Sequence, residues 1–309
     1  MQGVFLHRWI RCVYQNFLLF NFLIFSTPLQ AAVDSVLIVK SNNNHFFDTT
    51  IQQVIDSTDG HVKFNITALD SLKNKPELIG KPELIIALGF NAAFHLQEIQ
   101  PKSPVLLSYI TEFEYQQLNL KDGDTAVLLE QPLQRYLKFI KILLPLKTVG
   151  IIKKKSNRLT DQELKSIQKK LDITLNQHSY SLPVKSIDAV RNLLGESDLL
   201  LSLPEPNIYN RQSLKGILLT SYRQKKPVIS YSPAHVKSGA LAAIYASPKN
   251  IGNQIAGLLN QLNSQPYFSL QKRYYADTYN ITINDQVAQS LEINLPDKVS
   301  IKKAMDRDE

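Results

Sequence analysis

The run ISYSPAHVKSGALAAIYASPKNIGNQIAGLL, residues 229–259, shows the pattern that decides the fold of this chain. A short apolar segment ends at Tyr231-Ser232-Pro233, a polar excursion leads to Gly239, and a second apolar segment, ALAAIYA, follows at once. Ser247-Pro248 then begins a segment whose apolar residues recur at helical spacing. Short buried strands that alternate with amphipathic helices are typical of a parallel sheet covered by helices.

The same alternation extends along the chain from residue 35 onward and repeats in two halves. We therefore predict an α/β fold made of two doubly wound parallel-sheet lobes with a cleft between them. The predicted strands include SVLIV (35–39), HVKFNIT (61–67), LIIALG (84–89), PVLLSYI (104–110), TAVLLE (125–130), TVGIIKK (148–154), TLNQHSY (174–180), SDLLLSLPE (197–205), PVISYS (227–232) and ALAAIYA (240–246).

The predicted division of the chain follows the two halves. The N-terminal lobe would comprise residues 33–146 and the C-terminal lobe residues 147–270. Residues 271–309 would form a crossover strand and a C-terminal segment. Within them, the aromatic and alternating run YYADTYNITI (274–283) is expected to be a late strand that returns toward the first lobe.

The first 32 residues have the pattern of a signal peptide. Arg8 and Arg11 precede the apolar run FLLFNFLIF (17–25), and the small residues of STPLQAAVD follow. That run is shorter than the roughly 20 residues that span a membrane. We expect cleavage after Ala31 or Ala32 and a periplasmic mature protein, with an uncleaved membrane anchor as the alternative.

Cysteine and charge exclude several kinds of site and partner. Cys12 is the only cysteine and precedes the apolar run, so lipid attachment is not expected, and the mature chain would lack disulfides and thiolate chemistry. His45 and His235 are isolated in the sequence, so no metal site is predicted, and no cofactor is expected. The net charge of +8 is dispersed apart from Lys153-Lys154-Lys155, which does not indicate a nucleic-acid partner.

Polar and aromatic side chains follow several of the predicted strands. Ligands of parallel sheets bind at the carboxyl ends of the strands, and two facing lobes can close on a ligand by hinge motion. Backbone N–H groups after Ser41 and Gly89 favour an anion, whereas aromatic walls favour apolar burial or contact with a cation. Turns, helix caps and ordinary packing are the alternative roles of these residues. The predicted ligand-binding residues are Asn42, Asn43, Phe46, Phe90, Asn91, Tyr109, Glu205, Asn207, Tyr231 and Ser232.

The C-terminal half resembles a known family over residues 197–296. The segments that carry the resemblance are SDLLLSLPEPNIYN, PVISYS, GALAA, PKNIG and INDQVAQSLEINLP, in this order. They resemble the second lobe of TrpX-like substrate-binding proteins of ABC transporters. These are exported proteins with the type I periplasmic-binding protein fold. Residues 35–196 are consistent with the family, but their motifs are generic.

The resemblance implies a periplasmic solute-binding protein, expected to be a monomer, that captures a small polar or amino-acid-like ligand for an ABC permease. Two positions depart from the family pattern. The usual Thr-Pro-Ala turn of the first lobe is replaced by Gly89-Phe90-Asn91, and the usual aspartate of the second lobe is Glu205. Both positions lie at the expected site, so the identity of the ligand stays open.

Two other classes of function use a comparable α/β scaffold. A sensor that presents its solute to a membrane receptor or signalling protein needs the same cleft, and the sequence does not separate it from a transporter component. An enzyme is not expected, because the chain has no P-loop, no G-x-S-x-G, no H-E-x-x-H and no glycine-rich dinucleotide motif.

Overall fold

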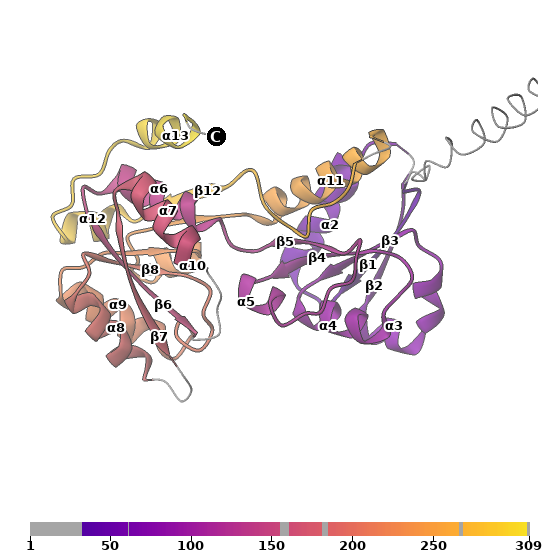
Figure 1. Cartoon of the computed structure of the whole chain (residues 1–309), viewed down its shortest axis with the longest axis horizontal. Helices are drawn as coiled ribbons and strands as arrows, with labels where there is room; N and C mark the ends of the chain where they lie inside the picture. Colours follow the sequence, from indigo (N-terminus) through magenta and orange to yellow (C-terminus); the bar gives the residue numbers. More distant parts are fainter. Residues whose placement is uncertain (1–32, 61, 155–160, 181–184, 266–267, 308–309) are drawn as a thin grey trace, which may run out of the picture.

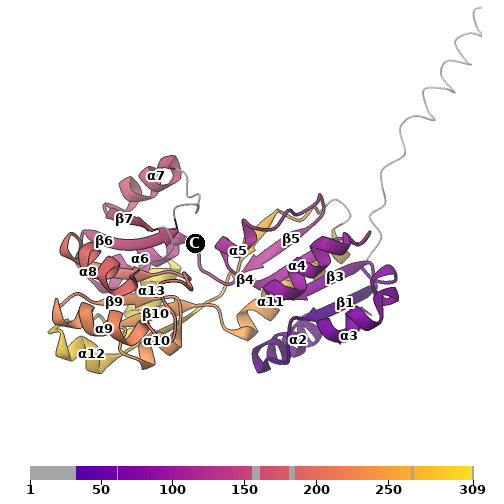
Figure 2. The same cartoon turned by 90° about the horizontal axis from the view of Figure 1, so that it is seen from below.

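The computed structural model describes residues 33–60, 62–154, 161–180, 185–265 and 268–307. They form two α/β lobes joined by connecting segments (Figure 1). In this part of the chain each lobe is built on a six-stranded sheet with helices on both faces (Figure 2). The predicted architecture of two doubly wound lobes is confirmed, whereas the predicted signal peptide lies outside the described residues.

The first sheet has the strand order β11-β5-β4-β3-β1-β2, and all its neighbouring strands run parallel. One core lies between this sheet and helices α2 and α11, and a second core lies on the opposite face under α3 and α4. The elements are β1 (Ser35–Lys40), α2 (His45–Ser57), β2 (Lys63–Ala68), α3 (Leu69–Asn74), the 3-10 helix η1 (Pro76–Gly80), β3 (Leu84–Leu88), α4 (Phe90–Ile99), β4 (Val105–Ile110), α5 (Glu112–Tyr115), β5 (Thr125–Leu128), α11 (Pro248–Ser264) and β11 (Arg273–Tyr275).

The second sheet has the order β12-β10-β9-β8-β6-β7, in which only β12 runs antiparallel among the described strands. Its faces are covered by α6, α7, α12 and α13 on one side and by α8, α9 and α10 on the other. The elements are α6 (Leu133–Leu143), β6 (Thr148–Lys154), α7 (Asp161–Leu171), β7 (Thr174–Tyr180), α8 (Ser186–Gly195), β8 (Leu199–Ser202), α9 (Leu214–Arg223), β9 (Val228–Ser230), α10 (Pro233–Lys237), β10 (Ala242–Tyr245), β12 (Asn280–Ile283), α12 (Asp285–Ser290) and α13 (Lys298–Asp306).

The described chain passes between the lobes at three places, and these do not coincide with the predicted boundaries. Helix α6 follows β5 of the first sheet but buries Tyr136 and Phe139 in the core of the second lobe. Helix α11 follows β10 of the second sheet but packs on the first lobe. The run 274–283 is not one strand, because β11 joins the first sheet and β12 joins the second. Helical spacing shows that a segment is amphipathic but not which sheet it covers.

Close contact between α11 and α2 joins the returning helix to the first lobe. A methyl group on Gly252 would lie 2.6 Å from Cβ of Gln53 and 2.9 Å from the backbone oxygen of Thr50. The Thr50 hydroxyl also donates a 3.0 Å hydrogen bond to the carbonyl of Pro248, at the start of α11. A glycine is therefore required where the two helices approach most closely.

Candidate functional site

The carboxyl ends of strands from both sheets lie on the sides of the lobes that face each other. Helix α5, which follows β4, lies toward the second lobe in both views (Figures 1 and 2). At this edge the segment after β5 crosses to the second lobe. Two buried clusters of polar side chains stand at these ends, one in each lobe.

The cluster in the second lobe surrounds Glu205, in the loop after β8. The Glu205 side chain is buried, and its carboxylate accepts a 2.8 Å hydrogen bond from the Tyr180 hydroxyl at the end of β7. Asn207 donates a longer hydrogen bond, 3.4 Å, to the same Tyr180 oxygen. Burial and the neighbouring Glu205 raise the pKa of Tyr180 to about 12. The sequence therefore selected two members of this cluster, Glu205 and Asn207, and missed Tyr180.

Tyr209 is buried beside this cluster. The backbone N–H of Tyr209 donates to the carbonyl of Glu205, which turns the loop back toward the sheet. The Tyr209 hydroxyl has no hydrogen-bond partner within the described residues. Burial is the main cause that raises the pKa of Tyr209, and the charges of Glu205, Tyr231 and Tyr180 contribute. The hydroxyl therefore lies within electrostatic range of all three residues.

Tyr231 and Ser232 follow β9. The Ser232 hydroxyl caps α10 by accepting from the N–H of Ala234 at 3.3 Å, so Ser232 has the capping role. The Tyr231 ring packs edge-on against His235, with 5.0 Å between the ring centroids. His235 Nδ1 lies 2.7 Å from Oγ of Ser230, and burial lowers the pKa of His235 to about 4. A neutral, buried histidine thus holds Tyr231, and Ser230 is fully buried rather than presented to a substrate.

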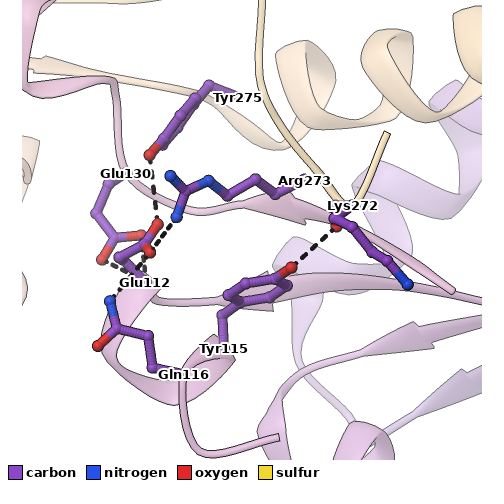
Figure 3. Close-up of polar contacts among 7 residues, drawn as sticks. All are labelled: Glu112, Tyr115, Gln116, Glu130, Lys272, Arg273 and Tyr275. Atoms are coloured by element: carbon purple, nitrogen blue, oxygen red, sulfur yellow. Dashed lines mark hydrogen bonds and ion pairs between the residues drawn. The ribbon is translucent and has the colours of Figure 1, made fainter. Parts of the chain in front are cut away.

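The cluster in the first lobe centres on Glu130, which is not among the predicted ligand-binding residues (Figure 3). Its side chain is 8% exposed, and both carboxylate oxygens accept from the backbone N–H of Glu112, at 2.9 and 3.1 Å. The pKa of Glu130 is raised to about 8, mainly by burial, with a contribution from the carboxylates of Glu112 and Glu114. No Lys, Arg or His among the described residues forms an ion pair with Glu130, whereas Glu112 pairs with Arg273 at 2.5 Å.

Glu130 also lies near residues of the second lobe. Its charge contributes to the raised pKa of Tyr231, and to those of Tyr136 on α6 and Tyr275 on β11. Tyr231 is in turn within electrostatic range of Tyr209, which neighbours Glu205. Two buried glutamates from opposite lobes thus have tyrosines in their electrostatic surroundings, and Tyr180 is hydrogen-bonded to one of them, Glu205. We call Glu130, Tyr231, Tyr209, Tyr180 and Glu205 the acidic–aromatic cluster.

Tyr109, at the end of β4, packs inside the first lobe. Its oxygen lies 2.6 Å from Thr50 Oγ1, and its hydroxyl also donates to the Phe46 carbonyl at 3.3 Å. Its ring stands edge-on to Phe47, with 4.9 Å between centroids. Its backbone has a φ of +57°, a left-handed conformation that is uncommon for a bulky residue. The hydroxyl predicted to contact a ligand is used instead in packing around α2.

The other predicted residues of the first lobe lie at its strand ends without hydrogen bonds to the acidic–aromatic cluster in the described structure. Asn42 and Asn43 are exposed before α2, where Asn44 is the helix cap. Phe46 is 56% exposed at the start of α2. Phe90 packs on Phe94 at the start of α4, beside the exposed Asn91.

Ser41, which is not among the predicted ligand-binding residues, caps the first turn of α4. The Ser41 hydroxyl accepts from the N–H of Ala92 at 2.9 Å. Gly89, with a φ of +93°, lies so close to Ser41 that a methyl group would be 2.7 Å from its hydroxyl. One of the N–H groups expected to bind an anion is therefore already satisfied.

Glu130, Tyr180 and Tyr209 are absent from the predicted residues, and they differ in whether the sequence pattern could have indicated them. Glu130 ends the run TAVLLE and Tyr180 ends TLNQHSY, so the strand-end criterion would have found both. Tyr209 lies within a loop, and its place beside Glu205 depends on the backbone hydrogen bond to Glu205 and on burial in the core of the second lobe. Other features point to no different centre. The described residues contain no group of three potential metal ligands, and no described helix is long and apolar enough to cross a membrane.

One cavity lies away from the cluster. It has a volume of about 600 Å³ and is bounded by the segment 277–283 and α13, with Lys298, Ile301, Lys302 and Asp306 in its lining. Its lining includes both lysines and aspartates, and neither Glu130 nor Glu205 contributes to it. It is therefore not the place where the strand ends of the two lobes meet.

A family model described as "ABC transporter substrate binding protein" matches residues 66–306. No curated protein matches the chain. A ligand-free, open substrate-binding protein with adhesive properties from Clostridium difficile is 16% identical, with a TM-score of 0.64, covering 86% of this chain and 97% of that one. An ABC domain in complex with L-Trp from Streptococcus pneumonia is 17% identical, with a TM-score of 0.58 and coverage of 88% and 98%.

A third similar structure is a periplasmic ribose ABC transporter protein from Conexibacter woesei, 13% identical, with a TM-score of 0.53 and coverage of 86% and 96%. At these identities the likeness shows the fold alone. The family model, however, extends over both lobes and most of the chain. This confirms the resemblance found in the second lobe: the chain belongs to the family of ABC transporter substrate-binding proteins.

Proposed function

We propose that the protein is exported to the periplasm, binds a small polar or amino-acid-like ligand between its lobes, and delivers it to an ABC permease. The family assignment supports solute binding, and the signal-like N-terminus supports export. The single observation that carries the ligand site is that a buried glutamate follows a strand of each sheet, Glu130 after β5 in the first lobe and Glu205 after β8 in the second.

The connections between the lobes are suited to a hinge. They run through the short segments 129–132, 246–247 and 276–279. Arg135 on α6 joins two of them, because it donates to the Gln131 side chain at 2.6 Å and to the Ala276 carbonyl at 2.8 Å. Its guanidinium also lies 4.8 Å from the centre of the Tyr279 ring. Short segments that are tied together would let the lobes rotate as rigid bodies about one axis.

Closure of the lobes would bring the acidic–aromatic cluster around the ligand. Tyrosine rings bury apolar surface and present hydroxyl groups, and carboxylates bind donors of the ligand. The Tyr209 hydroxyl, which lacks a partner within the described residues, supplies a further polar contact. The proposed function thus uses the strand ends of both sheets, where ligands of parallel α/β folds bind.

The test begins with the full chain expressed with its own N-terminus and purified from the periplasm. N-terminal sequencing checks export and cleavage, and light scattering checks the expected monomer. Thermal-shift measurements then screen amino acids, small carboxylates, nucleosides and sugars, because a ligand at a hundredfold its Kd stabilises the folded state by about 2.7 kcal/mol. X-ray scattering with and without a hit should show a smaller radius of gyration on binding. A blank screen with unchanged scattering would contradict the proposal.

A further inference from the structure

We propose that the ligand carries a positively charged nitrogen, as an ammonium or guanidinium group, and that Glu130 binds this group. The inference rests on the proposed function and names the chemical class that the same site selects. It follows from the charges, burial and hydrogen bonds around Glu130 rather than from the ligand of any similar structure.

The buried ionisable group at the end of β5 is acidic, whereas the chain as a whole is basic. The protein has a net charge of +8, and this buried group is the carboxyl group of Glu130. The cation nearest to Glu130 in Figure 3, Arg273, is paired with Glu112. A cluster that is acidic inside a basic protein favours a cationic ligand over an anionic one.

The surroundings of Glu130 disfavour its charged form in the free protein. Its carboxylate accepts from the backbone N–H of Glu112, and the side chains of Glu112 and Glu114 add negative charge nearby. A buried carboxylate without a cationic partner is unfavourable, and a cation that reaches it removes this penalty. The opposite-charge partner that is absent from the described residues would thus come from the ligand.

The tyrosines around Glu130 suit the same group. Tyr231, Tyr136 and Tyr275 are all within electrostatic range of the carboxyl group. The phenolic oxygens of such neighbours can accept hydrogen bonds from an ammonium group bound to the carboxylate. Closure of the second lobe would bring Tyr231, which is held by His235, to a cation at Glu130.

Binding of a cation should displace a proton. The raised pKa of about 8 keeps Glu130 protonated at neutral pH in the free protein, and a bound cation would stabilise its charged form. The groups around it are Glu112 and Glu114 on α5, Tyr136 on α6, Tyr231 after β9, and Arg273 and Tyr275 on β11. Arg273 is paired with Glu112, and burial raises the pKa of the three tyrosines, so they stay neutral. Affinity for the cation should therefore rise from pH 6 to pH 8, with release of up to one proton.

The experiment compares matched probes on the full-length exported protein by thermal shift and calorimetry. The charged probes are L-amino acids, putrescine and agmatine; the matched neutral-nitrogen probes are the N-acetyl amino acids and N,N′-diacetylputrescine, with ribose and glucose as uncharged solutes. We expect stabilisation by a charged probe and at least a hundredfold weaker binding of its acetylated form. Calorimetry in phosphate and in Tris, which differ in ionisation enthalpy, should reveal the proton released.

Two isosteric variants complete the test. Glu130→Gln removes the charge and keeps an oxygen that can accept from Glu112, so it should weaken binding of the charged probe at least tenfold. Glu98→Gln, at an exposed position on α4, is the matched control and should leave binding unchanged. The comparison of charged and acetylated probes on the unaltered protein tests the proposal even if Glu130→Gln does not fold.

The outcomes separate this inference from the proposed function. Equal binding of charged and acetylated probes, wild-type affinity of Glu130→Gln, or stabilisation by sugars alone would overturn the inference and leave solute binding intact. An absence of binding to every probe would overturn both.

Discussion

The phenolic oxygen of Tyr109 lies 2.6 Å from the hydroxyl of Thr50, and Thr50 donates to the Pro248 carbonyl at 3.0 Å. These contacts join the end of β4 to α2 and to the first turn of α11. They connect segments that are about 60 and 200 residues apart in the sequence. A side chain that looked like a ligand contact is thus part of the joint that holds the returning helix on the first lobe.

Tyr109→Phe should lower the free energy of unfolding by about 1 kcal/mol, because it removes the hydroxyl that contacts Thr50 and Phe46. Ligand affinity should stay the same. Urea unfolding and calorimetry measure the two effects. Tyr222→Phe, at a half-exposed position on α9, is the control and should leave stability nearly unchanged. Lost affinity without lost stability would return Tyr109 to the ligand site.

Gly252→Ala should destabilise the protein by about 1–3 kcal/mol, because the added methyl group meets the backbone of Thr50 and the stem of Gln53. Gly257→Ala, in the same helix, meets nothing within 4 Å and should stabilise by about 0.5–1 kcal/mol through helix propensity. Thermal unfolding of the two variants gives the comparison. Equal effects would show that α11 does not pack closely on α2.

Tyr209→Phe should raise the free energy of unfolding of the ligand-free protein by about 1 kcal/mol, because a buried hydroxyl without a partner within the described residues is removed. Tyr180→Phe should lower it by about 2 kcal/mol, because the bond to the Glu205 carboxylate is lost. Both variants should bind the ligand more weakly. If Tyr209→Phe were destabilising, its hydroxyl would have a partner in the free protein.

Glu130→Gln should change how stability depends on pH. The pKa of Glu130 rises from an ordinary value of 4.5 to about 8 in the folded state, so the folded protein binds this proton more tightly than the unfolded chain. That stabilisation is complete below about pH 4.5 and is lost as the pH rises to 8. The Tm of the variant should therefore increase relative to that of the parent from pH 5 to pH 8, as measured by thermal unfolding. A constant difference would contradict burial of the carboxyl group.

The sequence predicted the strands well where residues are buried on both faces. LIIAL, for example, is buried throughout as β3. A continuous apolar run of this length is typical of a strand that is buried on both faces. The alternating pattern was less informative in YYADTYNITI, whose two ends pair with different sheets on either side of a bend at Asp277-Thr278. The alternation of residue types shows that a segment is extended, but it does not show which strand the segment pairs with.

For the candidate site, the strand-end criterion found Glu205 and Tyr231 and would have found Glu130 and Tyr180, because the parallel sheet brings all such ends to one edge. The criterion could not distinguish Tyr109 and Ser232 from residues that face a ligand. The hydroxyl of Tyr109 turns into the lobe, and Ser232 caps a helix. Burial and hydrogen-bond partners decide whether a polar side chain faces a ligand, and both depend on distant segments.

By itself, the sequence determined the two α/β halves and the likeness of the second half to substrate-binding proteins, because hydrophobic period and turn residues act over short distances. Only the tertiary structure decided that α6 and α11 cover the lobe opposite to the strand that precedes them. It alone also placed Glu130 near Tyr231. These are contacts between residues far apart in the chain, and they arise only when whole sheets and helices pack together.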